Sequence, residues 1–182
     1  MFAGSSATKL DNFLQSLDNP DPKNSFNQRL LEIYMEWHQQ LPNNSEAVFK
    51  AGAILSDMGE HSQAIPWYRK AIEMDRYFIM AYLRLAASLT ELRQYSEAET
   101  IFLKATSLSP DLWDNYKEYG EFLLKRGRYQ DALPVFKKGT ELMPDLIPFW
   151  FYYKLCQVHI GDLEGAEATE LVIQEIKARQ RN

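Results

Sequence analysis

The sequence of 182 residues has one cysteine, few glycines and prolines, and no long apolar run. A single cysteine excludes an intrachain disulfide and is typical of a reducing compartment, so we expect a cytoplasmic location. Eight glycines and eight prolines are too few for long low-complexity linkers. The most apolar short stretch, Leu146 to Tyr153, is far shorter than the roughly 20 residues that a bilayer-crossing helix needs, so we expect no membrane insertion.

Positive charge is also scarce. The net charge is −5, it is spread evenly, and no part of the chain is basic, which argues against a nucleic-acid surface. The sequence contains no glycine-rich phosphate loop, no serine-centred elbow and no paired carboxylates in a pocket context. Residues Met1 to Leu10 have one lysine and no apolar run, so they do not predict a secretory signal. We therefore expect neither a catalytic site nor a cofactor.

What the sequence does contain is a helical hairpin between Tyr116 and Pro144. Two sets of residues at helical spacing encode it, namely Tyr116, Tyr119, Gly120 and Leu123, then Ala132, Phe136 and Gly139. Spacings of three or four positions place each set on one face of a helix. Gly127 lies between the two sets, where a glycine is typical of a helix end.

The same pattern recurs every 34 residues. The recurring positions are Ala64, Ala98, Ala132 and Ala166; the turn residues Gly59, Arg93, Gly127 and Gly161; the aromatic residues Tyr68, Phe102 and Phe136; the small residues Ala71, Ala105 and Gly139; the small residues Gly52, Ala86 and Gly120; and the loop residues Arg76, Pro110 and Pro144. Glycine or alanine allows two helices to approach closely, and the aromatic ring fills the wedge between one hairpin and the next.

This order and spacing resembles the tetratricopeptide repeat. The resemblance implies an all-α fold in which antiparallel helix pairs stack into a right-handed superhelix. The expected organisation is capping helices over 1–44, repeats over 45–78, 79–112 and 113–146, and a divergent fourth repeat with a C-terminal capping helix over 147–182.

Both ends depart from the regular pattern. Near the N-terminus we expect a short amphipathic helix over Lys9 to Leu17, a break at Asn19 to Pro22, and a helix from Phe26 to Gln40 with Ser25 as its N-cap. In the fourth repeat, Lys154, Glu170, Ile173 and Ala178 replace the small, aromatic, small and proline residues. We interpret the polar substitutions as the outward face of a terminal repeat.

The resemblance also implies a function, which is to bind a peptide segment of another protein in a concave groove without catalysis. In this family the first helix of each pair lines that groove. The corresponding positions are Glu46, Phe49, Ala53 and Ser56; Met80, Leu83, Arg84, Ala87 and Thr90; Asp114, Lys117, Glu118, Glu121 and Lys125; and Phe151, Tyr152, Leu155 and His159.

Each of these assignments has an alternative. Phe49, Leu83, Phe151 and Leu155 are either ligand contacts or core residues covered by a neighbouring helix. Arg84 and Lys117 either receive a partner's carboxylate or pair with Glu121 or Glu118.

Some members of the family grip a terminal carboxylate with lysine and asparagine. Phe49 and Ala53 occupy those positions here, so we expect no such clamp.

Two further features lie in the fourth repeat. Cys156 and His159 have a spacing that metal ligands can use, but no third or fourth ligand is near, so we expect no metal and interpret Cys156 as a small buried residue. In the run Leu146 to Tyr153 we expect Trp150 and Tyr153 to be buried. Phe149, Phe151 and Tyr152 are then expected to form an aromatic patch for a ligand or for a second copy of the chain, unless the following helix covers them.

Two alternative functions remain open at this stage. The chain could position a substrate as a domain or companion of a larger enzyme, such as a glycosyltransferase or sulfotransferase, although fold-level likeness alone supports this. It could also be a self-assembling scaffold that uses the aromatic C-terminal repeat.

Overall fold

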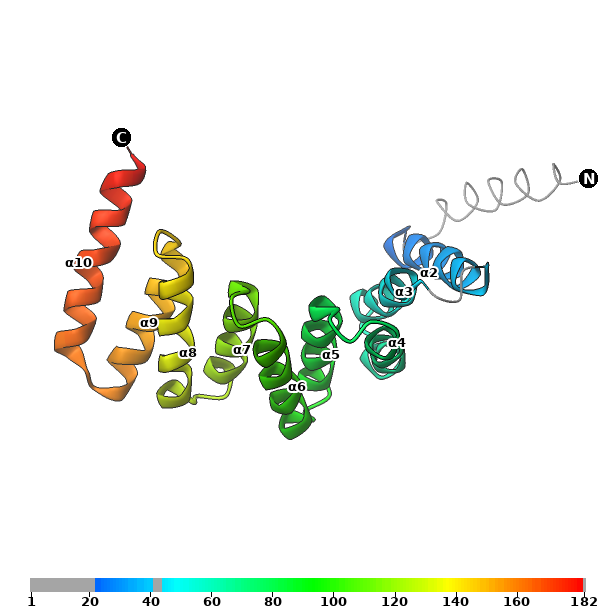
Figure 1. Cartoon of the computed structure of the whole chain (residues 1–182), viewed down its shortest axis with the longest axis horizontal. Coiled ribbons are helices and arrows are strands. Elements are labelled where there is room, and N and C mark those ends of the chain that lie inside the picture. Colours follow the sequence, from blue (N-terminus) through cyan, green and yellow to red (C-terminus); the bar gives the residue numbers. More distant parts are fainter. Residues whose placement is uncertain (1–21, 41–43, 182) are drawn as a thin grey trace, which may run out of the picture. The chain divides into compact units, whose positions relative to one another are not determined.

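The computed structural model describes residues 22–40 and 44–181, and all the regular structure in these residues is α-helical. The helices are α2 (Pro22–Gln40), α3 (Ser45–Asp57), α4 (His61–Met74), α5 (Ile79–Glu91), α6 (Tyr95–Leu108), α7 (Trp113–Lys125), α8 (Tyr129–Leu142), α9 (Ile147–Ile160) and α10 (Leu163–Gln180) (Figure 1). The predicted all-α fold of successive helix pairs is confirmed for this part of the chain.

Contacts divide the chain into two compact units, Met1–Ala98 and Glu99–Asn182, and the division falls within α6. In the first unit, α3 packs against α2 and α4, and α4 packs against α5. In the second unit, α8 packs against α7 and α9, and α9 packs against α10 (Figure 1). Within each unit, these helices contact their neighbours in the sequence, as expected for repeats that bury their apolar faces against one another.

The first described helix begins earlier than the sequence suggested. α2 starts at Pro22, so Ser25 lies inside the helix and is not its N-cap. Proline is well suited to the first turn, because the amide hydrogen that it lacks would have no partner there. The helix expected over Lys9 to Leu17 lies outside the described residues.

The predicted turn residues adopt the left-handed conformation that ends a helix. Gly59, Gly127 and Gly161 have φ angles of 83°, 69° and 84°. Arg93 takes the same place with φ 59°, although a side chain disfavours this region. The repeat register therefore fixes the turn geometry even where the glycine is replaced.

The repeated small and aromatic residues form the core of each unit. Ala64, Ala132, Tyr68 and Phe136 are all buried. A Cβ atom built on Gly120 would lie 2.4 Å from Cζ of Phe136, closer than real Cβ contacts allow. The glycine is therefore required because the aromatic ring of α8 packs directly on the backbone of α7.

A second repeated contact joins each of three first helices to the loop before it. The bonds run from Tyr82 Oη to the Arg76 carbonyl at 3.2 Å, from Tyr116 Oη to the Pro110 carbonyl at 2.7 Å, and from Trp150 Nε1 to the Pro144 carbonyl at 2.7 Å. Donors and acceptors both recur every 34 residues. The aromatic residue at this position thus acts through its polar edge as well as through its ring.

The aromatic run of α9 is arranged differently from the prediction. Phe149 is buried, and its ring occupies the space beside Gly139, where a Cβ atom would lie 2.1 Å from Cδ1 of Phe149. Trp150 and Tyr153, which we expected to be buried, are only half-buried. The indole of Trp150 donates to the Pro144 carbonyl in an exposed hydrogen bond. Phe149 therefore belongs to the core and not to a surface patch.

Candidate functional site

In the first unit, the predicted groove residues divide into a buried set and an exposed set. Phe49 is buried and packs against Tyr68 and Phe78, with ring centroids 5.7 and 4.8 Å apart. Leu83 is buried as well. Met80, by contrast, is 43% exposed. Of the remaining members of the set, some are half-buried, namely Ala53, Ser56, Ala87 and Thr90, and two are exposed, namely Glu46 and Arg84.

Three hydroxyl groups connect the helices of the first unit beside this face. The Ser56 and Ser88 hydroxyls lie 2.9 Å apart and join α3 to α5, while Tyr68 of α4 donates to Ser56 at 3.0 Å. Burial raises the pKa of Tyr68, which keeps the phenol protonated as a donor. Arg84 is exposed, and its guanidinium has the donor geometry that suits a carboxylate.

In the second unit, Lys117 is already paired. Its Nζ lies 3.2 Å from Glu118 Oε1 and 3.3 Å from Glu121 Oε1, all on α7. Burial lowers the pKa of Lys117, but the hydrogen bonds and charges of the two glutamates outweigh it, and the net shift is upward. Pairing within the helix is therefore the arrangement in the unliganded chain, and an incoming carboxylate would compete with two glutamates.

The aromatic residues of α9 lie next to this charged cluster. Phe151 is 51% exposed, and its ring meets Tyr152 edge to face at a centroid distance of 5.8 Å. Tyr152 also packs on buried Phe136, at 5.0 Å. Burial and, after it, the Glu121 charge raise the pKa of Tyr152. These contacts bring a charged part of α7 and an apolar part of α9 together on one face of the unit.

His159 and Cys156 of α9 have different surroundings. His159 stacks on Tyr129 of α8, with ring centroids 3.8 Å apart and an interplanar angle of 9°. Cys156 is buried, and burial raises the pKa of its thiol to about 11, so it remains a neutral packing residue at neutral pH. Within the described residues, no three metal-ligating side chains lie together.

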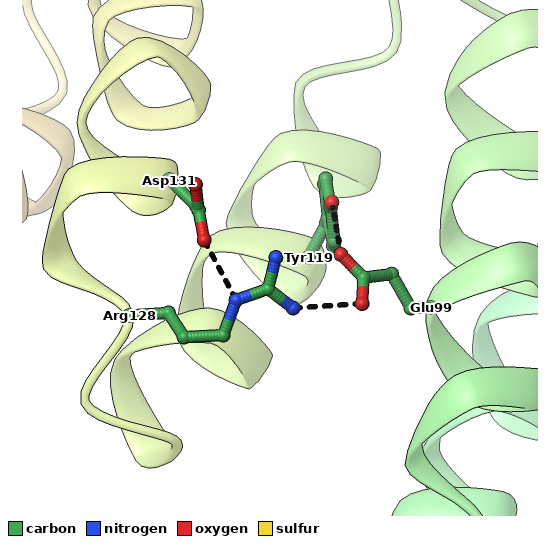
Figure 2. A network of polar contacts seen from close by, with 4 residues as sticks. All are labelled: Glu99, Tyr119, Arg128 and Asp131. Carbon is green, nitrogen blue, oxygen red and sulfur yellow. Dashed lines mark hydrogen bonds and ion pairs between the residues drawn. The ribbon is translucent and has the colours of Figure 1, made fainter.

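A further polar network in the second unit was not predicted. Arg128 Nη1 donates to Glu99 Oε2 and Arg128 Nε donates to Asp131 Oδ2, both at 2.7 Å, and Tyr119 Oη donates to Glu99 Oε1 at 3.0 Å (Figure 2). The hydrogen bond from Arg128 is the main cause that holds the pKa of Glu99 below its usual value. Burial, and then the bond to Glu99, raise the pKa of Tyr119 to about 12. The network connects α6, α7 and α8, so its role is to stabilise the unit.

The divergent fourth repeat contains a contact that its separate substitutions did not suggest. Lys154 Nζ lies 2.6 Å from Glu170 Oε2, and these are the positions that hold a small residue and an aromatic ring in the other repeats. Ile173 is buried, so this substitution belongs to the core and not to a polar outer face. Positions 154 and 170 are therefore still in contact, but through an ion pair in place of a small residue and an aromatic ring.

None of the helices in the described part of the chain is both long and apolar enough for a bilayer crossing. A family model with the description tetratricopeptide repeat matches residues 45–78 and 81–112. Among curated proteins, no sequence match was found.

Solved structures provide further likenesses. MamA residues 41 to the end from Desulfovibrio magneticus RS-1 has 18% identity and a TM-score of 0.71, with 100% of each chain covered. A second MamA structure has 18% identity and a TM-score of 0.74, over 96% of this chain and 93% of that chain. YrrB, described as a TPR protein with an unusual peptide-binding site, has 23% identity and a TM-score of 0.67, over 80% of this chain and 75% of that chain. At these identities the likeness establishes the fold alone.

Proposed function

We propose, from the premise that this chain is a tetratricopeptide-repeat protein, that it is a non-enzymatic adaptor. It binds a peptide segment of another protein along the first helices of its repeats. The observation that carries the proposal is the exposure of side chains suited to recognition on those helices: Phe151, Met80 and Arg84. The peptide-binding site of YrrB, a protein of similar fold, gives further support. A cytoplasmic location is part of this proposal and is supported by the single cysteine.

Charge reversal on the first helices tests this proposal. The variants Arg84→Glu and Lys117→Glu are compared with Lys104→Glu and Lys137→Glu, which reverse exposed charges on the second helices α6 and α8. Affinity capture from the native cell should recover the partner with the wild type and with both control variants. Recovery should fall several-fold with Arg84→Glu, because a partner carboxylate is then repelled, and it should change with Lys117→Glu, because this variant reverses the charge beside Glu118 and Glu121. Unchanged capture by both would contradict binding along these helices.

Self-association through the C-terminal repeat is a second candidate, and the exposed ring of Phe151 favours it. Light scattering over a concentration series tests it. A growing average mass that Phe151→Ser abolishes would support this candidate, and a monomer at every concentration would exclude it.

A further inference from the structure

Helix α9 is apolar on all sides, whereas the preceding first helix is not. Of the 14 residues of α9, Lys154 is the only one with a full charge. By contrast, α7 carries five charged residues: Asp114, Lys117, Glu118, Glu121 and Lys125. Two sides of α9 are accounted for, because it packs against α8 and α10. A helix that is apolar all round is normally enclosed on all sides, so its remaining side requires an explanation.

That remaining side carries three apolar residues in one row. Phe151, Leu155 and Val158 follow one another by four and three positions, and we call them the α9 ridge. Phe151 is 51% exposed, Val158 is 47% exposed and Leu155 is half-buried. One repeat earlier, the same three positions hold Lys117, Glu121 and Leu124, so two of them are charged there. The ridge is therefore a local property of the fourth repeat and not a general property of the fold.

The ridge lies beside a surplus of negative charge. Phe151 contacts Tyr152, and the Glu121 carboxylate is close enough to Tyr152 to influence its ionisation. Glu121 and Glu118 share the single ammonium group of Lys117. Across the whole predicted face of α7 there are three carboxylates and two ammonium groups, from the five charged residues named above. A cation placed between the ridge and α7 would thus meet one unbalanced carboxylate.

An approaching helix fits the ridge better than an extended peptide does. The ridge offers apolar side chains and no free backbone edge, so the N–H and C=O groups of an extended peptide would lose water without gaining partners. A helix bonds these groups internally and can seat its own apolar row beside a row with spacings of four and three.

Resting on the proposed function, we propose that the α9 ridge and the acidic side of α7 bind an amphipathic helix of a partner protein, with an apolar row on the ridge and lysine or arginine residues toward Glu118 and Glu121.

Fluorescence anisotropy with the full chain tests this partner chemistry. The probe is a labelled amphipathic peptide of leucine and lysine in helical pattern, and its matched control has glutamate in place of every lysine. We expect saturable binding of the basic peptide and at least about tenfold weaker binding of the acidic one, because its charges face the carboxylates of α7. Added salt should weaken the binding of the basic peptide.

Matched variants locate the site. Phe151→Ser should weaken binding of the basic peptide about tenfold, since a large apolar contact is lost. Leu171→Ser removes a side chain that is 67% exposed on α10 and should leave the affinity unchanged. Glu118→Lys should also weaken binding, while Glu164→Lys on α10 should have little effect. Circular dichroism melts confirm that each variant is folded.

The outcomes separate this inference from the proposed function. Equal binding of both peptides, equal effects of Phe151→Ser and Leu171→Ser, or no saturable binding of the basic peptide would overturn the inference. Self-association that Phe151→Ser abolishes would also overturn it, because a second copy would then occupy the ridge. The capture experiment with Arg84→Glu can still succeed in each case, since Arg84 belongs to the first unit and its test depends neither on the probe nor on the ridge.

Discussion

In the second unit, two helix pairs bring equivalent positions into contact. One pair does so with apolar residues and the other with charged residues. Between α7 and α8, Gly120 lies against the buried ring of Phe136. Between α9 and α10, the equivalent residues are Lys154 and Glu170, whose charged ends lie 2.6 Å apart and whose side chains are 28% and 39% exposed. The repeat therefore specifies that two positions touch, and their surroundings decide which residues can do so.

The surroundings differ because of what covers each contact. The Phe136 ring is covered by Phe149 and Tyr152 of α9, with centroid distances of 6.4 and 5.0 Å. The side chains of Lys154 and Glu170 keep contact with water, so their charges are solvated and also paired. An aromatic ring gains free energy only when it is enclosed, whereas an ion pair loses little by being half-exposed.

Truncating the residue at the aromatic position of each pair, Phe136 or Glu170, should separate the two pairs most clearly. Phe136→Ala should lower the free energy of unfolding by about 3 to 5 kcal/mol, because it leaves a cavity in a closed core. Glu170→Ala should change it far less. Chemical denaturation followed by circular dichroism measures both, and similar losses for the two variants would show that the two contacts are equivalent after all.

Adding one methyl group at the small position gives the next largest effect. In Gly120→Ala the new Cβ would lie within 3 Å of three atoms of the Phe136 ring. Overpacking costs about 1 to 3 kcal/mol, and the better helix propensity of alanine returns only about 1 kcal/mol, so we expect a net loss of stability.

The matched control is Lys154→Ala, which has no ring to displace. It should melt close to the wild type, and a Gly120→Ala variant that is as stable as wild type would mean that the Phe136 ring can move aside.

The repeat register predicted most of the fold because it depends on local chemistry. Gly127 and Ala132 occupy their predicted places since a left-handed turn and a close helix contact each restrict one position. Phe149 was misplaced because its burial depends on Gly139, which lies on a different helix. The pairing of Lys154 with Glu170 was missed because each substitution was interpreted alone.

The candidate site was less predictable than the fold. Which groove residues face a partner depends on what covers them: Phe49 is enclosed by Tyr68 and Phe78, whereas Phe151 is exposed. Sequence spacing is the same for both and cannot distinguish them. Their role as ligand contacts stays a prediction that the capture and peptide experiments address.

The polar network of Figure 2 should contribute an amount of stability between those of the two pairs. Glu99 accepts hydrogen bonds from Arg128 and Tyr119, so Glu99→Gln should lower the free energy of unfolding by about 1 kcal/mol at neutral pH. Glu141→Gln removes one partner of an exposed pair with Lys138 and should have almost no effect. If both variants melt alike, the network adds nothing beyond ordinary surface pairing.

The smallest expected effect is the dependence of the Lys154–Glu170 contact on pH and salt. The hydrogen bond from Lys154, followed by that from Gln174, lowers the pKa of Glu170 in the folded chain. A carboxylate with a lowered folded pKa stabilises the fold above its unfolded pKa of about 4.3, and this contribution is lost as the pH falls through the folded value. Glu170→Gln should thus melt slightly below wild type at neutral pH and level with it in acid.

Salt should remove this difference at neutral pH as well, because the pair is half-exposed. Control melts with Phe136→Leu should differ from the wild type by the same amount at both salt concentrations, since that contact carries no charge. A Glu170→Gln difference that persists in acid would indicate that Glu170 acts at this position through packing, as the aromatic ring does in the preceding pair, and the two pairs would then share one chemistry.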